Sequence, residues 1–116
     1  MRVYLTLFFL AALSSGCLAG EIRKGATMQV KANSIWFEEA GGLTRWQQLK
    51  KSGNAQAFET HQRELLSSRD AWQFIDPQTV KILRVRPRDH QVNVEMTAPG
   101  RLLGSTWFVD AEALER

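Results

Sequence analysis

The side chains best suited to acid–base or metal chemistry in this sequence are two histidines, His61 and His90, which lie far apart along the chain. Neither stands in a Ser or Cys context such as G-x-S-x-G, and no glycine-rich phosphate loop is present. His61 and Glu64 would share one face of a helix, as one half of a metal site does. Zinc requires three or four ligands, however, and no second pair exists. The sequence therefore predicts no catalytic residue, no metal site and no bound cofactor.

The densest charged feature is a basic cluster formed by Lys81, Arg84, Arg86 and Arg88. On a β-strand the three arginines fall on one face, because side chains alternate across a strand. Guanidinium groups pair well with carboxylates and phosphates, so this ridge is a candidate partner-binding surface. Asp89 beside it and Glu95 on the neighbouring strand could neutralise the ridge, which leaves a solvated sheet face as the alternative.

The first twenty residues have the order of a secretory signal peptide. Arg2 is followed by an apolar run over residues 3–13 and then by small residues at 14–16. The run has eleven residues, whereas a membrane-spanning helix needs about 20 apolar residues. The sequence therefore predicts export, followed by removal of this segment.

Cys17 is the only cysteine, and two processing routes account for it. Residues 13–17 (LSSGC) resemble the lipobox of bacterial lipoproteins, in which the cysteine is lipidated and becomes the new N-terminus. The apolar residue that such motifs prefer three places before the cysteine stands four places before it, at Leu13. In the other route signal peptidase recognises residues 17–19 (CLA), cuts after Ala19 and discards the thiol. The signal peptide is thus 1–19, or 1–16 with lipidated Cys17, and either route removes an unpaired thiol.

Residues 20–116 are long enough for one domain. Hydrophobic residues make up 44% of the chain and charged residues 23%, which is typical of a globular protein. No disulfide can form within the chain, so its stability must come from an apolar core, for which the tryptophans and phenylalanines supply bulky side chains. The net charge of +3 is too small to argue for binding to nucleic acid.

Hydrophobic periodicity predicts a strand, two helices and then further strands. Alternating apolar and polar residues predict strands over residues 27–32, 79–85, 91–97 and 104–109, with a β-favouring trio that extends the first strand at 35–37. Apolar residues on both faces of 79–85 indicate either burial on both sides or a bulge near Ile82. Gly41 and Gly42 predict a break. Helical spacing then predicts a hairpin of helices over residues 43–51 and from 55 onward, the second capped by Asn54, while Asp110 caps a last turn at 111–114.

Short strands joined by tight turns favour an antiparallel sheet that curls toward a barrel, because closure removes exposed edges. Residues 25–30 (GATMQV), 80–83 (VKIL) and 104–109 (GSTWFV), followed by Ala113 and Leu114, resemble bacterial SH3-type domains. The resemblance covers about half of residues 20–116, and the helices depart from it. They occupy the place of that family's long loop between its first two strands.

The expected fold is therefore of the α+β class: a small antiparallel SH3-like β-barrel with an inserted helical hairpin, preceded by a signal peptide. An α+β sheet with a packed helical hairpin, unrelated to SH3 domains, is the alternative.

The resemblance implies that aromatic residues in a groove, here Trp36 and Trp107, bind an extended peptide or a cell-wall glycopeptide. Burial of both rings in the core is the alternative. The expected function is an exported, noncatalytic binding or adaptor domain of the bacterial envelope, located in the periplasm or held at a membrane by lipid. It would engage an envelope protein or peptidoglycan through these tryptophans and the three arginines. A periplasmic inhibitor or immunity protein that blocks a toxin or hydrolase is the alternative function.

Overall fold

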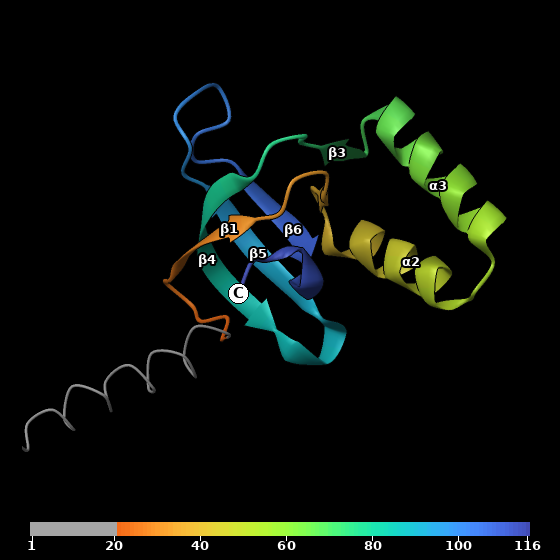
Figure 1. Ribbon diagram of the computed structural model, residues 1–116, viewed down its shortest axis with the longest axis horizontal. Helices are drawn as coiled ribbons and strands as arrows, with labels where there is room; N and C mark the ends of the chain where they lie inside the picture. Colours follow the sequence, from red (N-terminus) through yellow and green to blue (C-terminus); the bar gives the residue numbers. More distant parts are fainter. Residues whose placement is uncertain (1–20) are drawn as a thin grey trace, which may run out of the picture.

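The computed structural model describes residues 21–116 as one antiparallel sheet with two helices on one side of it (Figure 1). The predicted signal peptide and Cys17 lie outside the described residues. The strands are β1 (Thr27–Val30), β2 (Ile35–Phe37), β3 (Ala71–Gln73), β4 (Gln78–Arg86), β5 (Gln91–Met96) and β6 (Thr106–Asp110). The helices are α2 (Ala40–Lys51) and α3 (Ala55–Ser68), with 3₁₀ turns η1 (Pro87–Asp89) and η2 (Ala111–Ala113). The α+β class is confirmed, and no helix among the described residues is long and apolar enough to span a membrane.

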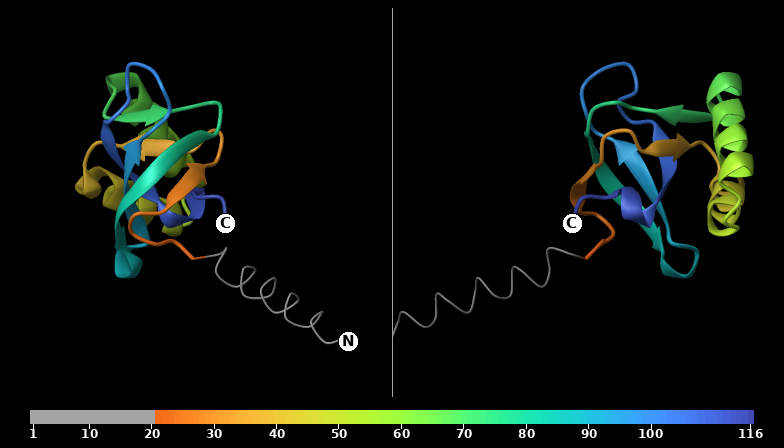
Figure 2. Two further views of the ribbon diagram at one scale, coloured as in Figure 1. Left: turned by 90° about the vertical axis from the view of Figure 1, so that its left-hand side faces the viewer. Right: turned by 45° about the vertical axis from the view of Figure 1, so that its right-hand side comes forward.

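The six strands pair in the order β1-β4-β5-β6-β2-β3. Both helices lie between β2 and β3 in the chain, and α3 is the outermost element (Figure 2). The predicted bulge in β4 is confirmed, because its register with β5 shifts between Ile82 and Arg84. This extra residue resets the alternation, so that Val85 packs against the same core as Val80 and Ile82.

The segment predicted as one extended strand is two strands that pair in different parts of the sheet. β1 pairs with β4, whereas β2 pairs with β3 and β6. Asn33 adopts a left-handed conformation with φ of 65°, and the Ser34 hydroxyl donates to the Lys31 carbonyl at 2.8 Å. Asparagine tolerates this conformation better than most residues, so the chain can turn here between β1 and β2.

The end of the chain returns to β1. Val30 forms an isolated antiparallel bridge with Leu114. The Lys31 amide donates to the Ala113 carbonyl at 2.7 Å, and the Glu115 amide donates to the Gln29 carbonyl at 2.9 Å. β1 therefore has hydrogen-bonded neighbours on both sides, although it is the first strand in the sheet order.

Both predicted caps are present. The Asn54 side chain accepts a hydrogen bond from the Ala57 amide at 3.0 Å, and the Asp110 side chain accepts one from the Glu112 amide at 2.8 Å. The predicted break at the glycine pair is wrong, because both glycines lie inside the first turn of α2. A Cβ atom at Gly42 would lie 3.4 Å from the Phe37 ring, an ordinary van der Waals contact, so the packing of α2 on β2 does not require glycine here.

The sheet has a hydrophobic cluster on each of its faces. The buried members of the inner cluster belong to the strands and to the end of the chain: Val30, Trp36, Val80, Ile82, Val92, Val94, Met96, Trp107, Val109 and Leu114. The outer cluster joins the sheet to the helices, and its buried members are Ile35, Phe37, Leu43, Trp46 and Ala71. β2 contributes to both clusters, because Trp36 points to one face while its two neighbours point to the other.

We expect Leu114→Ala to lower the free energy of unfolding by about 2–5 kcal/mol, because the leucine is only 1% exposed and its loss leaves a cavity at the junction with β1. Urea unfolding of the purified chain measures the loss. Leu103→Ala is the matched control, since Leu103 is 60% exposed and its truncation should cost little. Equal costs for the two variants would show that the end of the chain contributes nothing to the core.

Candidate functional site

Two clefts flank the contact between α2 and the sheet, and together they form what we call the α2 groove. The first, of about 460 Å³, lies between α2 and the β4–β5 turn that contains η1. The second, of about 410 Å³, lies between both helices, the β1–β2 turn and η2. Lys50, Asp110 and Glu112 line both clefts, so the two clefts meet at these residues.

A hydrogen-bonded network holds α2 on the sheet where the clefts meet. Gln91, which is 1% exposed, donates from Nε2 to Thr44 Oγ1 at 2.8 Å and to Gln47 Oε1 at 3.2 Å. Gln47 in turn donates from Nε2 to Asp110 Oδ2 at 2.9 Å and to the His90 carbonyl at 3.1 Å. α2 is therefore fixed to β5 and β6 by polar contacts with defined directions, which give it one position on the sheet.

The second cleft has an apolar floor made by Ile35, Trp46 and Phe58. The indole nitrogen of Trp46 donates to Gln62 Oε1 at 2.9 Å, which orients the ring. The Lys50 ammonium lies 5.0 Å from the centre of the same ring, within the range of a cation–π contact. The floor therefore combines apolar surface with one positive charge.

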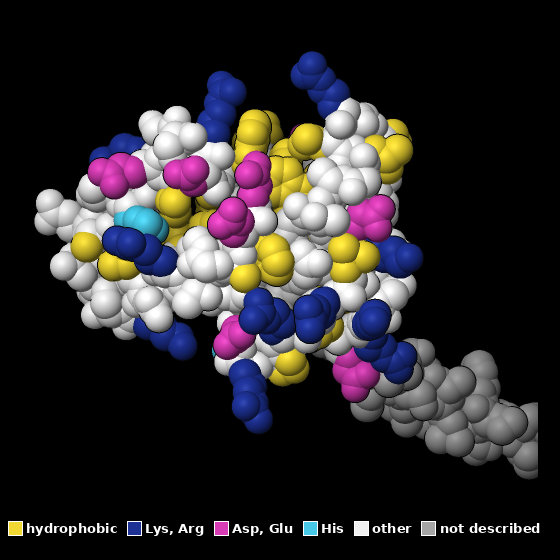
Figure 3. All heavy atoms as spheres, turned by 180° about the vertical axis from the view of Figure 1, so that it is seen from behind, with side chains coloured by type: hydrophobic (Ala, Val, Ile, Leu, Met, Phe, Trp, Pro, Cys, Tyr) yellow, Lys and Arg dark blue, Asp and Glu magenta, His cyan; other side chains and the backbone are white. Residues whose placement is uncertain are grey.

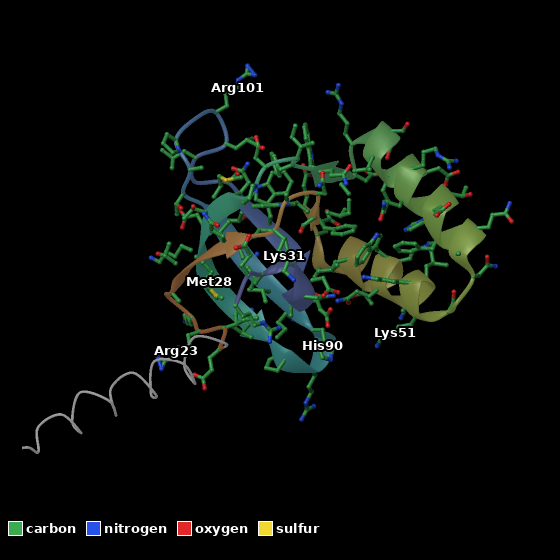
Figure 4. All side chains as sticks on the ribbon, in the orientation of Figure 1. Arg23, Met28, Lys31, Lys51, His90 and Arg101 are labelled. Atoms are coloured by element: carbon green, nitrogen blue, oxygen red, sulfur yellow. The ribbon has the colours of Figure 1, made fainter. Side chains whose placement is uncertain are left out.

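The walls of the groove carry opposite charges that do not pair with each other. Lys50 and Lys51 belong to the last turn of α2, whereas Asp110 and Glu112 stand on the opposite wall at η2. Within residues 21–116 the only ion pairs closer than 4 Å are Arg23 with Glu21 and Arg86 with Asp89. The charges of Lys50, Lys51, Asp110 and Glu112 are thus available to a ligand. Lys51 and His90 lie on facing sides of the first cleft (Figure 4).

The predicted arginine ridge lies on the sheet face that carries α2. Arg84 stands opposite Asn93, and Arg86 stands opposite the buried Gln91; partners across antiparallel strands share a face. Arg84 is exposed, whereas Arg86 is half-buried and pairs with Asp89 at 3.6 Å, as the neutralising alternative anticipates.

Arg88 belongs to η1 and lines the first cleft. The structure therefore brings one of the three arginines to the groove and places the other two beside it. On the face opposite to the view of Figure 1, Lys and Arg side chains gather in a row along the lower part, with acidic side chains next to them (Figure 3).

Trp36 and Trp107, the other predicted binding residues, lie in the inner cluster with exposures of 0% and 4%. Their rings meet edge to face with centroids 5.9 Å apart. Neither ring lines a groove, because both side chains point to the inner face of the sheet, so the core alternative describes them. The aromatic floor comes instead from Trp46 of α2.

His61 and Glu64 line a separate, open cleft between α2 and α3 together with Arg45. No group of three or more metal-ligating side chains occurs within residues 21–116. His90 is exposed in a left-handed turn with φ of 51°. The structure therefore keeps the two histidines in different clefts, and no described carboxylate or nucleophile is hydrogen-bonded to either of them.

No family model, no curated protein and no solved structure matches this chain.

We expect Gln47→Leu to lower the free energy of unfolding by about 1–3 kcal/mol, because it removes the donor to Asp110 and the acceptor for the buried Gln91. Urea unfolding measures this change. Gln48→Leu is the matched control on the same helical turn, since Gln48 is exposed and makes none of these bonds. If both variants lose the same stability, the network does not fix α2 on the sheet.

Proposed function

We propose that this chain is an exported, noncatalytic binding domain of the bacterial envelope that holds a protein or cell-wall ligand in the α2 groove. The groove itself carries the proposal. It offers unpaired charges of both signs on its walls and an aromatic floor at Trp46, on an element fixed by a polar network. Such mixed surfaces on a rigid scaffold suit recognition of a polypeptide.

The pairing of the strands supports an SH3-like arrangement. β1 pairs with β4, after which β4, β5 and β6 form a meander, and the turn η2 leads the chain back to β1 through the bridge between Val30 and Leu114. In our proposal this bridge closes the sheet into a small barrel. The helical hairpin, together with β2 and β3, then takes the place of the long loop between the first two barrel strands, which would be β1 and β4. The α2 groove lies between this insertion on one side and the β4–β5 turn, the β1–β2 turn and η2 on the other.

Export follows from the order of residues 1–19 and fixes the compartment in which the partner must be sought. We expect the envelope form of the chain to have lost this segment. Its mass should correspond to a chain that begins at Gly20, or at an acylated Cys17 that incorporates labelled palmitate. Mass spectrometry of fractionated cells makes the measurement, and Cys17→Ala controls for the label. Recovery of the intact 116-residue chain from the cytosol alone would refute export.

We expect a photo-cross-linking amino acid at Gln48, on the wall of the groove, to capture a partner in living cells. The same group at Arg63, exposed on α3 and outside the groove, should capture nothing. Immunoblots of the two variants compare the products. A product that a muramidase shortens identifies a cell-wall ligand, whereas one stoichiometric protein band identifies the target of an inhibitor or immunity protein. Equal labelling from both positions would exclude the groove as the binding site.

A further inference from the structure

We infer that the α2 groove selects an extended polypeptide segment in which an acidic residue and a basic residue are adjacent. This inference rests on the proposed function and names the ligand class of the same site. It follows from the arrangement of charges where the two clefts meet, together with the alternation of side chains along an extended chain.

The centre of the groove is electrically polarised from wall to wall. Lys50 is the cation that both clefts share, and Asp110 and Glu112 are the carboxylates that both share. None of these three forms an ion pair within 4 Å, although they face the same space. Lys50 therefore neutralises neither carboxylate directly, and a ligand between the walls can contact both signs.

The polar contacts of these residues hold the charges in place. Asp110 accepts hydrogen bonds from the Gln47 side chain and the Glu112 amide, which keeps its carboxylate on the η2 wall. Lys50 lies over the Trp46 ring, 5.0 Å from its centre. The other charged residues of the groove each line only one cleft: Lys51, Arg88 and Asp89 line the first, and Lys31 lines the second. Asp89 is paired with Arg86 at 3.6 Å.

An extended peptide matches this arrangement because its successive side chains point in opposite directions. When the peptide runs along the groove, an acidic side chain can reach the α2 wall while its basic neighbour reaches the η2 wall. A pair of like charges would place one side chain against a wall of its own sign. Repulsion then discriminates against such sequences, which is the usual origin of charge-pattern specificity.

The test uses immobilised peptides of one neutral scaffold whose central pair is Glu-Lys, Glu-Glu, Lys-Lys or Gln-Gln, probed with the purified chain. We expect the Glu-Lys peptide to bind about fivefold more tightly than either like-charged peptide, which corresponds to two solvent-exposed ion pairs. The preference should weaken as salt is raised. Equal binding of all four peptides would overturn the inference. Muropeptides are tested alongside, and binding to them with no binding to any of the four peptides would overturn it as well.

Charge reversal then changes the preference in a defined direction. Lys50→Glu should move it toward the Lys-Lys peptide, whereas Glu112→Lys leaves Asp110 on the η2 wall and should reduce the discrimination against the Glu-Glu peptide. Arg63→Glu, outside the groove, is the matched control and should keep the original preference, with an unchanged urea midpoint confirming the fold of each variant. If the cross-linker at Gln48 captures a partner while these variants keep the same preference, the inference fails and the proposed function stands. If the groove captures nothing, the proposed function itself fails.

Discussion

β2 is buried on both of its faces, and the rest of the structure depends on this double burial. Trp36 is fully buried in the inner cluster, while Ile35 and Phe37, at 7% and 1% exposure, pack on the opposite face against the helices. A strand of three residues thus belongs to two hydrophobic clusters at once. Because β2 lies between β6 and β3, it fixes the helical hairpin to the sheet and sets the edge along which α2 must run.

Hydrophobic contacts have no fixed direction, so they alone do not set the position of α2 on the sheet. The buried Gln91 adds directional contacts to α2. Its side chain occupies the outer face beyond the hydrophobic contacts, and burial of an amide is favourable only when its hydrogen bonds are made. Thr44 and Gln47 accept hydrogen bonds from its Nε2 group, so α2 is held to the sheet at this point, whereas the buried Oε1 has no hydrogen-bond partner among the described residues. The clefts on either side of this network are the consequence, and they provide the space in which a ligand can meet charges from both walls.

Local patterns in the sequence predicted the features that depend on local chemistry. The period-two alternation located β5. Apolar residues on both faces of 79–85 indicated either burial on both sides or a bulge, and the structure has the bulge. Asn54 and Asp110 cap the helical turns that follow them, as predicted. The groove could not be predicted in this way, because Lys50 and Glu112 are distant in sequence and meet only through the pairing of β2 with β6. The burial of Trp36 likewise depends on which face of β2 points to the inner cluster. The β-favouring trio 35–37 does not determine this, because all three of its residues are apolar.

The sequence predicted the arginine ridge but not the α2 groove, and the register of the sheet relates the two. Arg86, Gln91 and Asp110 stand in one row across β4, β5 and β6, so they share the face on which α2 lies. In this row a buried amide separates a guanidinium from a carboxylate, and both charges remain near solvent. The same face therefore offers opposite charges at a spacing fixed by strand pairing, which is more rigid than any spacing set by flexible loops. Of these two charges only Asp110 lines the groove, because Arg86 is paired with Asp89 at 3.6 Å and lines neither cleft. The sheet therefore supplies the carboxylate wall, and α2 supplies the cation that faces it.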